Sequence, residues 1–337
     1  MKNLTKPVTD STVFCARYIF RDTFPFVPVV APANIYDGIL IKPSGVKCFS
    51  PRFPDFQHSI DDYVEFINKH SLEKAMVIAS DISFLEKCPT LKYLTVVPSD
   101  SADDNFDFSP LYKHPEIIYL RCHTEYGINF QRKSAVDYSK INGLINLHIS
   151  GTGHFNCNYV QTLKTFSISE HGKENLYDVL GETKLDNLRI IDSSIKSLRG
   201  LERLKDLRIL ELSYNRKLED ISALEDASKT LKSLMIENCH KIKDFSVLEK
   251  LEHLEILILY GNNTLSDLSF LKKMKKLRIF AFNVAVLNGD LTPCLNIEHV
   301  FCARNRKYYN LKNPDLPKSN IDLDTIMYDG IEYWRRF

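Results

Sequence analysis

Apolar residues recur along the chain as pairs that flank a single variable position. In chain order the pairs are Ala75/Val77, Leu94/Val96, Leu120/Cys122, Leu147/Ile149, Phe166/Ile168, Ile191/Ser193, Leu210/Leu212, Leu234/Ile236, Leu257/Leu259, Phe280/Phe282 and Val300/Cys302. Because alternate side chains of a β-strand point to opposite faces, each pair predicts a short strand with one buried face. The regular return of the pair predicts about eleven repeated units over residues 72–305.

A second motif, Asp-hydrophobic-Ser-x-Leu, also recurs. It reads DISFL at 81, DISAL at 220, DFSVL at 244 and DLSFL at 267. Its apolar residue and its leucine are expected to point inward, while the Asp and Ser side chains bond to the backbone of a local turn. The motif is therefore interpreted as the return path of each repeat and not as a functional site.

The unit at residues 204–224 (LKDLRILELSYNRKLEDISAL) resembles the leucine-rich repeat, L-x-x-L-x-L-x-x-N/C-x-L. The frame residues are Leu207, Leu210, Leu212, Asn215 and Leu218. The match is strong over 185–305 and weaker over 72–180. At the asparagine position the other units carry Ser99, Thr152, His171, Cys239 and Asn262. The short repeats of 19–27 residues resemble the bacterial internalin-like and phosphatase-regulatory-subunit-like subclasses.

This resemblance implies an α/β solenoid: a leucine-rich-repeat horseshoe with a parallel β-sheet on the concave face and 3₁₀ turns outside. A solenoid needs capped ends, so residues 1–71 are expected to form an N-terminal cap and 306–337 a C-terminal cap. The first cap includes a strand-like segment at 37–43. It also includes a predicted helix after the N-cap Ser59, with Tyr63, Phe66 and Ile67 on one face.

The variable positions of the strands form the predicted concave face, which is small and polar in its middle. The C-terminal third is expected to carry an exposed apolar patch that binds a partner, bordered by acidic residues. The predicted apolar residues are Ile258, Tyr260, Phe301, Met235, Ile256 and Ile279, and the acidic residues are Glu211, Glu237 and Asp192. The alternative is that the C-terminal cap folds back over this patch.

The composition of the chain indicates no catalytic or ligand-binding chemistry. The formal net charge is +1, which favours neither nucleic acid nor an anionic membrane as partner. Eight cysteines are scattered singly, and the start of the chain lacks the order of a secretory signal, so a reducing, cytoplasmic location and a monomer are expected. No phosphate-loop, metal or cofactor motif is visible, and the pair Cys122-His123 is interpreted as structural.

The sequence therefore predicts a non-catalytic protein-interaction module that holds a protein partner on its concave face. Two alternatives of that kind stay open: an immunity or inhibitor protein that masks an enzyme, and a regulatory subunit that targets one. A third alternative, from a different class, is an enzyme with an unrecognised site in residues 1–71.

Overall fold

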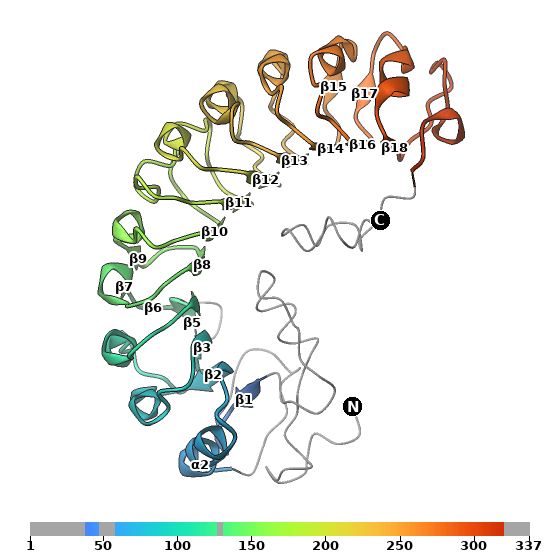
Figure 1. The fold of residues 1–337 in the computed structure, drawn as a ribbon. Coiled ribbons are helices and arrows are strands. Elements are labelled where there is room, and N and C mark those ends of the chain that lie inside the picture. Colours follow the sequence, from blue (N-terminus) through green and yellow to red (C-terminus); the bar gives the residue numbers. More distant parts are fainter. Residues whose placement is uncertain (1–37, 47–57, 127–130, 320–337) are drawn as a thin grey trace. The chain divides into compact units, whose positions relative to one another are not determined.

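The computed structural model describes residues 38–46, 58–126 and 131–319 (Figure 1). The chain divides into two compact units, Met1–Leu163 and Lys164–Phe337. Each unit contains a run of parallel strands joined by short 3₁₀ turns. Parts of both predicted caps, residues 1–37, 47–57 and 320–337, lie outside the described residues.

The first unit holds five neighbouring parallel strands of the main sheet. They are β1 (Ile39–Ile41), β2 (Lys74–Ala79), β3 (Tyr93–Pro98), β4 (Tyr119–Cys122) and β8 (Asn146–Ser150). Two small pairs accompany them: β5 (Glu125–Tyr126) with β6 (Arg132–Lys133), and β7 (Val136–Asp137) with β9 (His154–Phe155). The strand-like segment predicted at 37–43 is β1, which pairs with β2 and so extends the sheet.

The predicted amphipathic helix is α2 (Ile60–His70). Ser59 is its N-cap and forms a reciprocal capping box with Asp62, which satisfies free N–H groups of the first turn. Tyr63, Phe66 and Ile67 are its buried residues, as the helical spacing predicted. The helix therefore covers apolar side chains at the start of the first unit.

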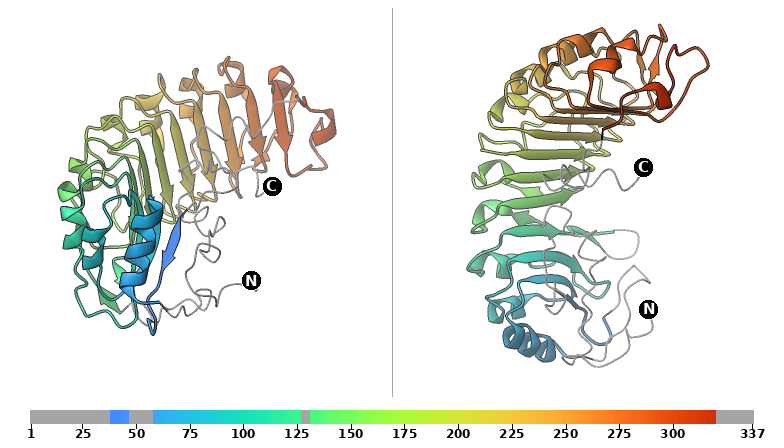
Figure 2. Two further views of the ribbon diagram at one scale, coloured as in Figure 1. Left: turned by 60° about the horizontal axis from the view of Figure 1, so that its bottom comes forward. Right: turned by 45° about the vertical axis from the view of Figure 1, so that its right-hand side comes forward.

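The second unit holds seven neighbouring parallel strands of the main sheet. They are β10 (Thr165–Ser169), β11 (Asn187–Ile191), β12 (Ile209–Ser213), β13 (Ser233–Glu237), β14 (Ile256–Tyr260), β16 (Ile279–Phe282) and β18 (His299–Cys302). The short strands β15 (Thr264–Leu265) and β17 (Ala285–Val286) pair separately. Within this unit the strands lie side by side along the inner edge, with the turns along the outer edge (Figures 1 and 2).

The interior of the second unit is built from the predicted leucine pairs. Leu210, Leu212, Leu257 and Leu259 are all at most 1% exposed and lie on parallel strands, so this prediction is confirmed. Strand pairing places Leu210 opposite Leu234, and Leu234 opposite Leu257. Each repeat thus adds its leucines to a continuous apolar row.

The Asp-hydrophobic-Ser-x-Leu motif forms the start of a 3₁₀ turn, as predicted. In each copy an Asp carboxylate accepts a hydrogen bond from the backbone N–H two residues later, for example Asp267 from Ser269 at 2.7 Å. These hydrogen bonds with Ser269 hold the pKa of Asp267 below its usual value. The sequence analysis overlooked a fifth copy, DFSPL at 107–111, where Asp107 accepts from Ser109 in the same way.

The 3₁₀ turns follow the strands through both units. Their bounds are Ser83–Lys87, Ser109–Lys113, Tyr138–Lys140, Cys157–Tyr159, Leu201–Arg203, Ser222–Ala227, Ser246–Lys250, Ser269–Lys272, Thr292–Asn296 and Asn313–Asp315. Turns this short occupy less width than α-helices, which fits repeats of 19–27 residues.

A buried polar residue or cysteine follows the strand in several repeats of the second unit. Asn215 donates to the carbonyl of Ile190 at 2.7 Å and accepts from the Ser193 N–H at 3.0 Å. Cys239 replaces asparagine in the next repeat, and its thiol lies 3.5 Å from the Leu212 carbonyl. The residue before each, Tyr214 or Asn238, has a positive φ of 58° or 53°, which turns the chain out of the strand.

Two residues that the sequence analysis placed in this ladder do not belong to it. Asn262 is exposed, whereas Asn263 is 4% exposed and donates to the carbonyls of Cys239 and Ile242. Gly261, at φ +129°, adds one residue before the ladder in this repeat. In the first unit Thr152 is exposed, and His154 instead bonds to the Ser150 carbonyl at 2.9 Å.

One apolar pair was also predicted in the wrong register. The interior residues of β11 are Leu188 and Ile190, which pair with Leu210 and Leu212, and not Ile191 and Ser193. Ile190 and Ile191 are adjacent and equally apolar, so either can follow the alternation. Backbone pairing to β12 decides between them.

The described part of the predicted C-terminal cap, residues 306–319, packs on the last repeat. Tyr309 is 3% exposed, and its hydroxyl accepts from the Val286 N–H at 3.1 Å. Residues beyond its short turn return to β18, where the Val300 N–H donates to the Pro317 carbonyl at 2.9 Å. The end of the described chain therefore lies beside the last strand.

Because Asn263 and not Asn262 is the buried ladder residue, replacing each of them with alanine should change the stability of the protein by different amounts. Asn263→Ala removes one donor from each of the Cys239 and Ile242 carbonyls, of which the Cys239 carbonyl still accepts from the Ile242 N–H, and should lower the free energy of unfolding by about 1–3 kcal/mol. Asn262→Ala is the matched control and should stay within about 0.5 kcal/mol of wild type. Urea unfolding followed by circular dichroism measures both, and the reverse order would contradict the assigned register.

Candidate partner-binding face

One face of the second unit's sheet is lined by the residues that alternate with the interior leucines. On β14 these are Ile256, Ile258 and Tyr260. Strand pairing aligns Ile258 with Met235 on one side and with Ala281 on the other. The register thus brings residues from repeats far apart in sequence into one row.

The apolar side chains on this face form one group, called here the strand-face cluster. Its members are Ile209, Met235, Ile256, Ile258, Tyr260, Ile279 and Ala281, with the half-buried Phe301 packed against them. All six apolar residues predicted for partner binding therefore lie together. Ile209 and Ala281 are additional members that the same alternation could have identified.

The cluster is not exposed, contrary to the prediction of an exposed patch. Its side chains range from 0% exposed for Ile279 to 9% for Ile209. Strands β14 and β16 read ILILY and IFAF, with an apolar residue at every position. A parallel strand without polar alternation is typical of a sheet that is covered on both faces.

Glu211, predicted to border the patch, lies in a buried ion pair. Its carboxylate accepts from the guanidinium Nε and Nη2 of Arg189 on the neighbouring strand, the second at 3.2 Å. Ser213 donates to the same carboxylate at 3.0 Å. The side chains of Arg189 and Glu211 are only 17% and 5% exposed, so Arg189 neutralises Glu211 where it lies.

Glu237 does lie beside the cluster, directly opposite Tyr260 on the next strand. It accepts a hydrogen bond from the Tyr214 hydroxyl at 3.3 Å. Burial, together with nearby Cys302 and Glu237, raises the pKa of Tyr260 well above its usual value. Tyr260 therefore keeps its proton at any physiological pH and acts as a neutral, amphipathic ring.

Asp192, the third predicted acidic residue, does not lie on this face. It follows β11 with φ 44°, and its N–H donates to the Ser213 carbonyl at 2.9 Å. This is the turn position before the ladder residue Ser193. The register of β11 places Arg189, and not Asp192, at the central position of this strand on the cluster's face.

On the equivalent face of the first unit, Leu40, Met76, Ile78 and Val97 form a second buried apolar cluster, whereas the strands nearer the middle of the sheet carry polar residues, as the sequence predicted. Thr95, Arg121 and His148 are aligned on three neighbouring strands. Burial, together with the charge of Arg121, lowers the pKa of His123 to about 3. Burial also raises the pKa of the Cys122 thiol. A neutral thiol and a neutral imidazole give no thiolate–imidazolium pair, which supports a structural role for Cys122-His123.

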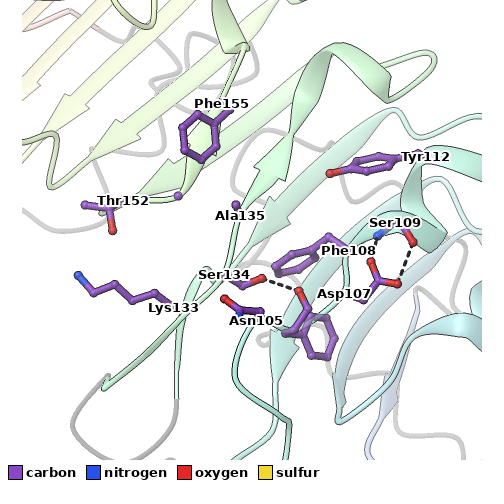
Figure 3. Close-up of a pocket in the computed structure, with 12 residues that line it drawn as sticks. Asn105, Asp107, Phe108, Ser109, Tyr112, Lys133, Ser134, Ala135, Thr152 and Phe155 are labelled. Carbon is purple, nitrogen blue, oxygen red and sulfur yellow. Dashed lines mark hydrogen bonds between the residues drawn. The ribbon is translucent and has the colours of Figure 1, made fainter.

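The first unit also carries an open pocket of about 630 Å³ (Figure 3). Its lining includes Lys133, Phe106, Phe108 and Phe155, of which Phe155 is 55% exposed. Its charged groups already have partners, since Lys133 lies 3.4 Å from Glu125 and Asp107 accepts from Ser109. None of the predicted site residues lies in this pocket.

Over the described ranges, no group of three or more His, Cys, Asp and Glu side chains is arranged to hold a metal ion. A search of the same part of the chain also finds no helix that is long and apolar enough to cross a membrane. The candidate site is thus the strand-face cluster, defined by packing and not by reactive groups.

Comparison with known proteins supports the fold assignment. No family model and no curated protein matches the chain. Among solved structures, an internalin (inlF) from Listeria monocytogenes is 19% identical, with 74% of this chain and 79% of that chain covered and a TM-score of 0.50.

Two further similar structures are less alike. The functional domain of InlJ from Listeria monocytogenes is 14% identical, with 67% of this chain and 55% of that chain covered and a TM-score of 0.44. The mouse RP105/MD-1 complex contains a chain that is 13% identical, with 78% of this chain and 49% of that chain covered and a TM-score of 0.49. This chain thus spans about half the length of each of these two.

Identities this low concern the fold alone. The likeness to the internalin agrees with the features described above: parallel strands with interior leucines, 3₁₀ turns and a ladder of buried polar residues. The chain therefore has a leucine-rich-repeat fold, built from short repeats of parallel strands and 3₁₀ turns.

Proposed function

We propose that this chain is a non-catalytic protein-interaction module whose partner binds the face of strands β12 to β18. The observation that carries the proposal is the strand-face cluster itself. It joins Met235, Ile258 and Tyr260 on three neighbouring strands, with Phe301 at its edge. Large aliphatic and aromatic side chains gathered at one place provide most of the binding energy in protein interfaces.

The border of the cluster favours a particular kind of partner. Glu237 lies opposite Tyr260, whereas Glu211 is already neutralised by Arg189. Glu237 is thus the acidic residue at the border of the site, and it suits a basic or amide-rich rim on the partner. A rim charge of this kind acts more on the association rate and its salt dependence than on affinity.

The partner proposal is tested with Ile258→Asp/Tyr260→Ala in a pull-down from native lysate. Loss of apolar anchors at an interface centre costs about 2–4 kcal/mol, so partners of the wild type should be lost. Leu287→Asp is the matched control, because Leu287 is 61% exposed and lies outside the cluster. All variants must first show the same thermal unfolding. A double variant that retains every wild-type partner would place the site elsewhere.

The proposed module is a monomer that acts in the cytoplasm and takes no cofactor. The cysteines support a reducing compartment: Cys88, Cys122, Cys157, Cys239, Cys294 and Cys302 are all free and buried. Burial raises the pKa of Cys239 and Cys88 to about 11, so these thiols stay protonated and unreactive.

The compartment is tested by counting thiols in protein purified from its native cell. Alkylation under denaturing, non-reducing conditions should label all eight cysteines, as read from the mass of the intact chain. Two or more unlabelled cysteines would indicate a disulfide and contradict the cytoplasmic location.

A further inference from the structure

The pocket of the first unit is formed by loops that follow three neighbouring strands (Figure 3). The loops follow β3, β4 and β8, and they contribute residues from 105–112, 133–135 and 152–155. The volume of about 630 Å³ lies within the range of small-molecule sites. The pocket is separate from the strand-face cluster, whose residues all belong to the second unit.

Hydrogen bonds between the three loops hold the walls of the pocket in place. The Ser134 hydroxyl donates to the Phe106 carbonyl of the first loop. The Thr124 hydroxyl donates to the Thr152 carbonyl of the third loop at 2.6 Å. Gly153 has φ +82°, and a Cβ atom there would clash with the Ser134 carbonyl oxygen, so the close approach of these loops requires glycine. The pocket is therefore preformed, which lowers the conformational cost of binding.

Phe155 gives the pocket an apolar wall that is still open to solvent. Its side chain is 55% exposed, whereas Phe108, which also lines the pocket, is 2% exposed. Strand pairing sets Phe155 opposite Asp137. The Asn156 side chain next to it donates to the Asp137 carboxylate at 2.9 Å. An aromatic ring that is held in place with half of its surface in solvent offers a contact for the apolar body of a ligand.

Lys133 supplies a positive charge that an anionic ligand can use. Its side chain is 64% exposed, and its ammonium lies 3.4 Å from the Glu125 carboxylate, a surface ion pair that contributes little to stability. Glu125 has a closer partner, because the Thr152 hydroxyl donates to it at 2.6 Å. That hydrogen bond is the largest cause of the lowered pKa of Glu125. Lys133 has three donors and can therefore bind a second anion without leaving Glu125 unpaired.

The acidic residue of the lining does not oppose such a ligand. Both carboxylate oxygens of Asp107 accept from Ser109, one from its N–H and one from its hydroxyl, each at 2.8 Å. Asp107 therefore belongs to the 3₁₀ turn that follows it. A single ammonium beside an aromatic wall matches a ligand with one negative charge better than one with two.

We propose that this pocket binds a small molecule that has an aromatic body and one carboxylate. The aromatic body packs on Phe155 above the buried Phe108, and the carboxylate pairs with Lys133. In the view of Figure 3, Lys133 and Phe155 lie on either side of Thr152. The site does not depend on the partner-binding face proposed above.

The proposal is tested by titrating the full chain with phenylacetate, followed by ligand-observed NMR. Phenylacetate should bind saturably, and phenylacetamide, which has the ring without the charge, should bind several-fold more weakly. Acetate, which has the charge without the ring, should not compete. Absence of saturable binding, equal binding of the amide, or competition by acetate would each overturn the proposal.

Phe155→Ala locates the bound ring. It should weaken the binding of phenylacetate and of phenylacetamide by about fivefold, because both lose the aromatic contact. Tyr159→Ala is the matched control, since Tyr159 is 68% exposed and does not line the pocket. Circular dichroism should show that both variants keep the wild-type fold. Unchanged binding by Phe155→Ala would place the probe elsewhere and contradict the proposal.

Lys133→Gln tests the charge separately. It should weaken phenylacetate by about twofold to fivefold, the range of an exposed ion pair, and leave phenylacetamide unchanged. Lys87→Gln is the matched control, because the Lys87 side chain is 67% exposed and pairs with Asp61 at 4.0 Å, outside the pocket. A preference for the carboxylate that survives Lys133→Gln would contradict the assigned role of Lys133 and with it the proposal.

Discussion

Hydrogen bonds between the backbones of consecutive parallel strands are the interaction on which the rest of this structure depends. They align Leu210, Leu234 and Leu257 in one interior row and, by alternation, set Met235 opposite Ile258 on the other face. A slip of one residue would exchange the two faces. The ladder residues, such as Asn215, then satisfy the backbone groups where each strand ends. The positions of the interior leucines, of the turns and of the candidate site residues are thus all set by one register of strand pairing.

The regular repeats could be predicted from sequence because their leucine spacing has only one interpretation as a strand. The frame around Leu257 and Leu259 is an example. The helix after Ser59 was predictable for a different reason, because its cap and its helical spacing of apolar residues agree. Prediction failed where the local sequence allowed two registers. Ile190 and Ile191 are equally apolar, and Gly261 adds a residue that moves the ladder from Asn262 to Asn263. Only pairing with the neighbouring repeat resolves such cases.

The residues of the candidate site were predictable, but their exposure was not. Alternation places Ile258 and Tyr260 on the outer face, and it says nothing of what packs on that face. The missing signal was the run of apolar residues in β14 and β16, which indicates cover on both sides. Arg189, which neutralises Glu211, was missed for a different reason, the register of β11.

The central claim is that one strand register gathers apolar side chains from separate repeats into the strand-face cluster. A double-mutant cycle between Met235→Ala and Ile258→Ala tests this claim most directly, with urea unfolding of the full chain as the measurement. Side chains in contact should show a coupling of about 0.5–3 kcal/mol. Effects that add to within about 0.5 kcal/mol would contradict the account.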